Sequence, residues 1–264
     1  MRFYRNCTSF PLVVDMFKKR KNSRTYRHNK NIASLLSFVA GIVNVTGILS
    51  LEQLTTNVTG HFGYFVDEMF KMHYFEGFIY FLYILFFFLG SFASNLLIEL
   101  ISKRSDRFIY IIPTIIEMVI LFLLAVLGSV ILEWRPHVIA LSLLFAMGFQ
   151  NSLVTVISNA VVRTTHLTGL FTDLGIEVSK LFFYKIPEQR RLLKRTIYLR
   201  LRIILFFFSG GICGGIVYSR IGFYVLFIPV ALLFLGIFYD TMKYQLILLK
   251  RKKYQQLFRM YKNE

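Results

Sequence analysis

Two copies of one short polar phrase interrupt a chain that is otherwise rich in Phe, Leu and Ile. The phrase reads TTNVTGHFGY from Thr55 and TTHLTGLFTD from Thr164, so both copies share the pattern TT-x-x-TG. Glycine ends helices and permits close backbone approach, while threonine hydroxyls satisfy freed backbone groups or coordinate a ligand. Amides at the start of a half-helix favour an anion, and unwound carbonyls favour a cation. The phrases therefore predict two helix breaks with ligand-binding chemistry.

The composition places these breaks in a membrane. Of the 264 residues, 56% are hydrophobic and 29 are Phe, and the mean hydropathy is +0.58, which exceeds what a soluble domain buries. A spanning helix needs about 20 apolar residues. Six stretches meet or approach that length: 31–51, 77–98, 108–132, 138–162, 203–219 and 221–239. The run 54–66 and the apolar residues after Thr164 are too short or too interrupted, and they predict re-entrant or half-helix segments.

The Lys and Arg residues orient the six predicted helices. With the N-terminus inside, all but three of the 31 Lys and Arg fall in cytoplasmic segments, and the three exceptions are Lys71, Arg135 and Arg220. Cytoplasmic segments retain positive charge, so six helices with both termini cytoplasmic is the predicted topology. The net charge of +17 is explained by this topology, and the basic tract FKKRKNSRTYRHNK predicts attraction to anionic lipids rather than to RNA.

Internal repeats explain why the polar phrase occurs twice. FVAGIVN (38–44) recurs as FAMGFQN (145–151), ILFFFLG (84–90) recurs as ILFFFSG (204–210), and IIP (111–113) recurs as FIP (227–229), in the same order. The chain thus divides into two membrane halves, 31–132 and 138–239, between basic tails at 1–30 and 240–264. Each half has three predicted helices, an odd number, so the repeats are inverted. The predicted fold is an all-α polytopic membrane protein, with partial helices after helices 1 and 4.

The repeated segments also resemble a known family. FVAGIVNVTG (38–47) with NVTGHFG (57–63), and GFQNSLV (148–154) followed by RTTHLTGLFTDLG (163–175), are similar to the YoaK-like multi-pass bacterial membrane proteins. The resemblance covers residues from about 33 to 239. It implies a location in the bacterial inner membrane and the same fold, and it implies little about activity. The first half departs from the family pattern at His61, where a small-residue phrase of the MTGN type is expected.

Inverted repeats in transporters hold substrate between the halves, at broken helices. The substrate site is therefore predicted at the repeated phrases and at the amides of the preceding helices, where the alternative is hydrogen bonding between helices. The predicted substrate-binding residues are Asn44, Thr55, Thr56, Thr59, Gly60, Gln150, Asn151, Thr164, Thr165, His166, Thr168 and Gly169.

Three charged residues are candidates for coupling or gating. Glu117 is the one acid well inside a predicted helix, and its repeat equivalent is Leu233. An intramembrane carboxylate is costly, so Glu117 predicts either proton or cation coupling or a protonated acid bonded to a neighbouring helix. Arg163 and Asp173 flank the second phrase, where they either gate or bind an ion or form an interfacial salt bridge.

Two classes of function remain open. The preferred one is a secondary transporter of a small solute or ion, working by alternating access. The other is a membrane scaffold or regulator that acts through its basic tails. No nucleophile–base pair or metal-ligand spacing occurs, so no catalytic residue, metal, cofactor or nucleic-acid partner is predicted. The cluster GGICGG (210–215) permits close helix contact, either within the monomer or in a homodimer.

Overall fold

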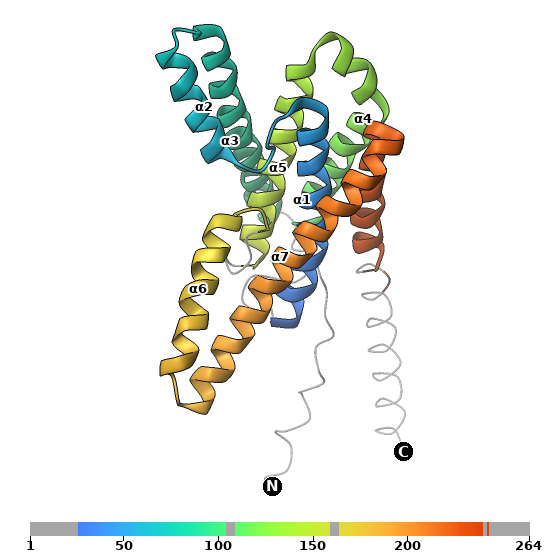
Figure 1. The fold of residues 1–264 in the computed structure, drawn as a ribbon. Coiled ribbons are helices and arrows are strands. Elements are labelled where there is room, and N and C mark those ends of the chain that lie inside the picture. The colour runs from blue at the N-terminus through green and yellow to red at the C-terminus, as the bar shows by residue number, and fades with distance from the viewer. Residues whose placement is uncertain (1–25, 104–108, 159–163, 240–241, 243–264) are drawn as a thin grey trace, which may run out of the picture.

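The computed structural model describes residues 26–103, 109–158, 164–239 and 242 (Figure 1). Every regular element in this part of the chain is helical, as predicted. The elements are α1 (Tyr26–Leu51), α2 (Val58–Phe70), α3 (Tyr74–Ser102), α4 (Ile111–Trp134), α5 (Pro136–Ser158), α6 (Leu167–Phe183), α7 (Pro187–Ile221) and the 3₁₀ helix η2 (Gly222–Leu226). Residues 227–239 are helical again. The basic tails, predicted at 1–30 and 240–264, lie almost entirely outside the described residues.

Five helical segments are long and apolar enough to cross a membrane. They are Lys30–Leu51, Tyr74–Ser102, Ile111–Trp134, Pro136–Val156 and Pro187–Tyr239. The first four coincide with predicted spans. The fifth has 53 residues and contains α7, η2 and residues 227–239, so two of the predicted spans fall within it. The chain is therefore a polytopic helical membrane protein.

The segment before the predicted fifth span is helical, which the sequence did not predict. α6 occupies the place of the partial helix expected after the second phrase, but residues 187–202 also form the first sixteen residues of α7. α7 begins with Pro187 at its first turn and Glu188 beside it, and both residues favour a helix start. The following Arg, Leu and Lys residues are good helix formers, which the hydropathy pattern does not register.

The bundle is built on two pairs of crossing helices, and each pair takes one helix from each half of the sequence. α1 packs along α7, and α3 packs along α5. A Cβ placed on Gly41 of α1 would overlap the carbonyl oxygen of Phe207 on α7, and one on Gly148 of α5 would overlap that of Phe87 on α3. Gly41 matches Gly148 in the repeat, and Phe207 matches Phe87.

A second set of close approaches completes each crossing. A Cβ on Gly210 would overlap the carbonyl oxygen of Phe38, and one on Gly90 would overlap that of Phe145. These residues again occupy matching positions in the two copies of the sequence. Gly210 belongs to the GGICGG cluster, which therefore packs within the chain through this residue. Only glycine allows backbones to approach this closely.

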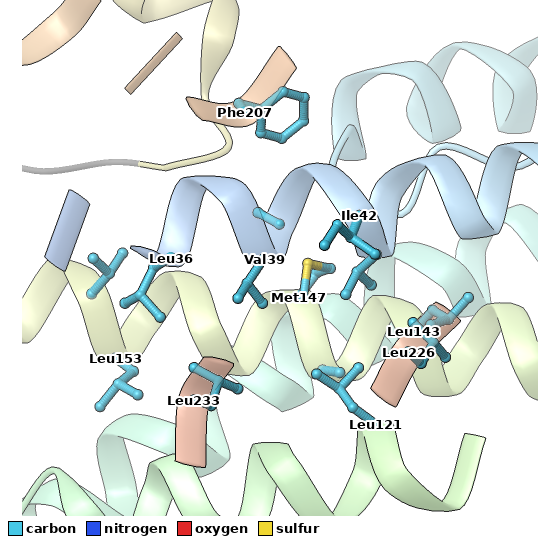
Figure 2. Packing of buried hydrophobic residues seen from close by; sticks show 14 of the residues in the cluster. Leu36, Val39, Ile42, Leu121, Leu143, Met147, Leu153, Phe207, Leu226 and Leu233 are labelled. Atoms are coloured by element: carbon cyan, nitrogen blue, oxygen red, sulfur yellow. The ribbon is translucent and has the colours of Figure 1, made fainter. Parts of the chain in front are cut away.

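Apolar side chains fill the centre of the bundle. In Figure 2, Leu36 and Val39 of α1 point toward α5, and Met147 lies between the two helices. Leu121 of α4 and Leu233 lie on the other side of α5, and both are fully buried. α5 is consequently surrounded by neighbouring helices, which explains why 61% of its most apolar window is buried against only 22% for α3.

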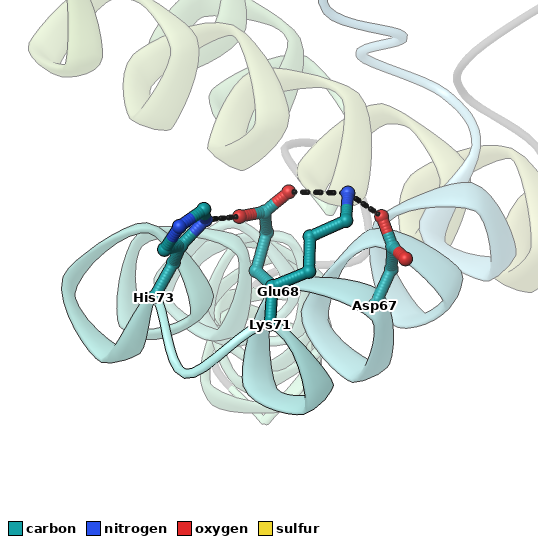
Figure 3. Close-up of polar contacts among 4 residues, drawn as sticks. All are labelled: Asp67, Glu68, Lys71 and His73. Atoms are coloured by element: carbon teal, nitrogen blue, oxygen red, sulfur yellow. Dashed lines mark hydrogen bonds and ion pairs between the residues drawn. The ribbon is translucent and has the colours of Figure 1, made fainter.

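The short helices α2 and α6 each form a hairpin with the long helix that follows. Figure 1 shows the α2–α3 hairpin at one end of the bundle and the α6–α7 hairpin at the other. The turn after α2 is closed by charged side chains (Figure 3). Lys71 Nζ lies 2.6 Å from Asp67 Oδ2, and His73 Nδ1 lies 2.8 Å from Glu68 Oε2. α2 has 13 residues and α6 has 17, so both are shorter than a spanning helix.

Candidate functional site

A cavity of about 800 Å³ lies where both repeated phrases meet the two crossing pairs. Its walls come from α1, α3, α5 and α7 and from the first turns of α2 and α6. Both segments that the sequence marks as helix breaks thus border the same space. The lining residues are Asn44, Leu54, Thr56, Asn57, Val58, Thr59, Gly60, Phe87, Asn151, Thr155, Thr165, His166, Leu167, Thr168 and Phe207.

In the first half, the amide of Asn44 on α1 fixes the loop that precedes α2. The Thr56 hydroxyl donates to Asn44 Oδ1 at 2.9 Å, and the Thr56 backbone N–H donates to the same oxygen at 3.3 Å. Thr55 Oγ1 lies 3.5 Å from this oxygen and is fully buried. Three donors thus converge on one carbonyl oxygen, which holds the loop against α1.

In the second half, Asn151 on α5 makes the matching contact. The Thr165 hydroxyl donates to Asn151 Oδ1 at 2.7 Å. Asn151 matches Asn44 in the repeat, and Thr165 matches Thr56. The same side-chain pair therefore anchors both breaks, and all four residues line the cavity.

The two short helices begin at the cavity wall. Asn57 caps α2, and its side chain accepts a hydrogen bond from the Gly60 backbone N–H at 3.1 Å. His166 occupies the matching position before α6 and makes no side-chain cap bond. Thr59 of α2 and Thr168 of α6 lie in the first turns and line the cavity. Helix starts carry a partial positive charge, so both short helices direct this charge toward the cavity.

Four predicted substrate-binding residues lie outside the cavity lining. Thr55 and Thr164 are fully buried, and Thr164 Oγ1 has no hydrogen-bond partner among the described residues. The Gln150 side chain donates to the Leu36 carbonyl at 3.3 Å, so it bonds between helices, which was the alternative interpretation. Gly169 packs against the His166 ring, which a Cβ at that position would overlap.

The three coupling or gating candidates also lie away from the lining. Glu117 is fully buried on α4, and neither carboxyl oxygen has a hydrogen-bond partner among the described residues. Leu233, at the matching position, is equally buried. Asp173 on α6 forms an ion pair with Arg200 of α7, with Oδ2 2.8 Å from Nη1, which agrees with the salt-bridge interpretation. Arg163 lies outside the described residues.

Sequence reasoning missed several lining residues, of which Phe87 and Phe207 are the most informative. They occupy the same place in the two copies of ILFFF. The repeat indicated that the two residues correspond, but it did not indicate that their rings face the cavity. Thr155 was also missed, and no residue of the first half lines the cavity at the matching position, 48. A Phe-rich helix gives no signal for the ring that faces a cavity, because its neighbours are equally apolar.

The lining chemistry is that of hydrogen bonding rather than of ionic binding. The polar lining residues are Asn, Thr and His, and no Asp, Glu, Lys or Arg occurs among the described residues of the wall. Hydroxyl and amide groups both donate and accept, and the two Phe rings add apolar contact. This combination of convergent polar groups and apolar contact is typical of a small-molecule site.

These features define a polytopic helical membrane protein with an internal cavity that residues of both TT-x-x-TG phrases line. The chain belongs to the family described as Protein of unknown function (DUF1275), whose model matches residues 32–239. It is similar to the UPF0700 transmembrane protein YoaK of Bacillus subtilis (strain 168), with 25% identity over 217 residues that cover 78% of this chain and 92% of that protein. The YoaK-like resemblance is therefore confirmed. No solved structure matches the chain.

Proposed function

We propose that this protein is a secondary transporter of a small polar solute, which binds in the cavity between two inverted repeats and crosses the membrane by alternating access. Transporters with inverted repeats hold substrate at broken helices near the repeat interface. The cavity has the same structural features, which are two helix starts, hydroxyl and amide groups, and walls from both halves of the chain.

One observation carries the proposal, and it is the matched origin of the lining. Twelve of the fifteen lining residues form six pairs that occupy equivalent positions in the two halves. The pairs are Asn44 with Asn151, Thr56 with Thr165, Asn57 with His166, Val58 with Leu167, Thr59 with Thr168, and Phe87 with Phe207. A site divided equally between two halves can open to either side when the halves exchange conformations, which is the requirement for alternating access.

Helix direction supports the inverted arrangement. Contacts along α1 and α7 advance in the same direction, from Lys30 with Tyr198 to Ile42 with Gly214. Contacts along α3 and α5 do the same, from Tyr83 with His137 to Ser91 with Gly148. The helices run parallel in both pairs, α1–α7 and α3–α5, and the sequence repeat relates each helix of one pair to a helix of the other. This relation fits a two-fold axis in the membrane plane. In this proposal, the turn at η2 makes residues 227–239 the sixth crossing, with both termini in the cytoplasm of a bacterium.

Transport is tested with the purified chain in proteoliposomes. Solute panels of neutral amides, polyols, nucleobases, amino acids and small anions are screened first by thermal stabilisation, because a ligand of the folded state raises its stability. Each hit is then measured by counterflow. We expect saturable counterflow of one solute class, and we expect Thr59→Val and Thr168→Val to reduce it at least about tenfold by removing a hydrogen bond to the solute.

Thr172→Val is the matched control, because Thr172 lies on α6 and its hydroxyl donates to the Thr168 carbonyl rather than into the cavity. This variant retains counterflow under the proposal. Stabilising hits without counterflow would indicate a binding protein. A complete lack of hits and of counterflow would contradict the proposal and favour a scaffold role for the tails.

A further inference from the structure

The α6–α7 hairpin carries a second recess, which is separate from the central cavity and differs from it in chemistry. A groove of about 530 Å³ lies along the first three turns of α7. Its lining residues are Pro187, Arg190, Arg191, Lys194, Arg195 and Tyr198. On a helix these positions share one face, because they recur at intervals of three and four residues. Four cations thus line one small groove.

These cations contrast with the arginine on the opposite face of the same helix. Arg200 is paired with two carboxylates of α6, since Nη1 lies 2.8 Å from Asp173 Oδ2 and Nε lies 2.9 Å from Glu177 Oε2. Among the described residues, no acidic side chain pairs with Arg190, Arg191 or Lys194, and all three are exposed. The acids of α6 are therefore used to hold the hairpin, and the groove keeps its positive charge.

A further cation extends the groove toward α1. Lys30 Nζ lies 5.8 Å from the ring centroid of Tyr198, which is the lining residue nearest to the bundle. Next along α1, Ser34 accepts a hydrogen bond from Arg202 of α7. The positive surface therefore begins at the free end of the hairpin and continues to the point where α7 enters its apolar segment.

Large apolar side chains flank the groove at the tip of the hairpin. Phe182 and Phe183 at the end of α6 are each 81% exposed, and Ile186 before α7 is 55% exposed. A soluble anion would leave these side chains in water. A membrane surface accommodates both features, because basic groups meet lipid phosphates while aromatic and aliphatic groups enter the acyl boundary.

From this arrangement we propose that the α6–α7 groove binds the headgroup of an anionic phospholipid, with Arg190, Arg191 and Lys194 contacting the phosphate and Phe182 and Phe183 inserting beside it. Arginine suits this role because its planar guanidinium pairs with phosphate through two hydrogen bonds. The hairpin thereby fixes α6, and with it the helix start at the central cavity, to the lipid surface.

Native mass spectrometry of the detergent-purified full chain tests this proposal with phosphatidylglycerol and phosphatidylcholine as probes. We expect phosphatidylglycerol to bind at least about tenfold more tightly than phosphatidylcholine. The triple variant R190Q/R191Q/K194Q should lose about 10- to 100-fold in affinity for phosphatidylglycerol, because each of the three cations adds to the attraction of the groove for the lipid phosphate. Arg190→Lys with Arg191→Lys retains charge and should bind within a few-fold of the unmodified chain.

The matched control removes three cations at the opposite end of the bundle, as K71Q/R135Q/R220Q, and should leave the affinity unchanged. Equal losses in both triple variants would overturn the site, because net charge alone would then explain the binding. Equal binding of phosphatidylcholine would overturn the recognition of anionic headgroups. Competition by glycerol phosphate at the same concentration as the lipid would assign the groove to a soluble anion instead.

Discussion

Asn44 and Asn151 each anchor one helix break by accepting a hydrogen bond from a threonine at the matching position, Thr56 or Thr165. The helices that follow the two breaks nevertheless differ in what they bury. On α2, His61 is buried, and its Nε2 donates to the Leu54 carbonyl at 2.8 Å. On α6 the matching position is Leu170, which is also buried. Leu54 lines the cavity, so the hydrogen bond from His61 fixes part of the cavity wall in the first half. The Leu170 side chain has no polar atom and cannot make this contact in the second half.

The same contrast recurs at the ends of the hairpins and in the core. The α2–α3 turn pairs Lys71 and His73 with nearby acids, whereas the α6–α7 hairpin leaves a basic groove. The core has Glu117 in one half and Leu233 in the other. Identical residues at matching positions form the helix crossings and the Asn–Thr anchors, while the residues that differ lie at the hairpin ends, in the core and at part of the cavity wall. Matched substitutions should therefore act equally at shared positions and unequally at divergent ones.

The crossing glycines should give the largest effect. We expect Gly41→Ala and Gly148→Ala each to lower the free energy of unfolding by about 3 kcal/mol, because the added methyl group meets a backbone carbonyl that cannot rotate away. Thermal unfolding in detergent measures this loss. Gly175→Ala on α6 is the control, since no atom lies within 4 Å of the added Cβ, and it should be neutral or slightly stabilising. A large loss at only one of the two crossings would break the equivalence of the halves.

The next effect concerns the buried acid. Glu117→Leu copies the residue at the matching position. We expect it to stabilise the protein by about 2 kcal/mol, because it removes from the core a carboxyl group that has no hydrogen-bond partner among the described residues. The melting temperature should rise in parallel. If Glu117 couples transport to protons, the same variant loses the pH dependence of counterflow while it gains stability. A destabilised Glu117→Leu variant would show that the carboxyl group contributes to folding.

Loss of the anchoring hydroxyls should have a smaller and symmetrical effect. Thr56→Val and Thr165→Val each remove the donor to an Asn side chain, and we expect each to cost about 1 kcal/mol of stability. The Thr→Ser variants retain the hydroxyl and serve as controls. We expect the loss of stability at Thr56 to be the smaller of the two, because Thr55 and the Thr56 backbone N–H also donate to Asn44.

The smallest effect is expected at the α2–α3 turn. The hydrogen bond from His73, together with Lys71, lowers the pKa of Glu68 below its ordinary value of 4.5. The stabilisation is thus present above pH 4.5 and is lost as the pH falls through the lower pKa of the folded state. Glu68→Gln should remove this dependence from a melting series between about pH 3 and 6. If the melting temperature of the variant depends on pH as in the unmodified chain, the pH dependence comes from other acids.

The sequence permitted prediction of the helical membrane fold, of the first four spans and of eight cavity residues, because hydropathy and repetition report these features directly. It did not predict which of two adjacent threonines faces the cavity. Thr55 and Thr56 both approach Asn44 Oδ1, but only Thr56 lines the cavity, and this difference depends on the path of the loop. Nor did it predict the helical start of α7, because its basic residues resemble those of a cytoplasmic loop.

In the proposed transport cycle the cavity opens to each membrane face in turn, and cysteine accessibility tests this most directly. Thr59→Cys and Thr168→Cys are made separately in a chain with Cys7 and Cys213 replaced by Ser, and a membrane-impermeant thiol reagent is added to either side of oriented vesicles. We predict that each position reacts from both sides, and that a transported solute slows both reactions. Reaction from one side only, at both positions and in every condition, would contradict alternating access.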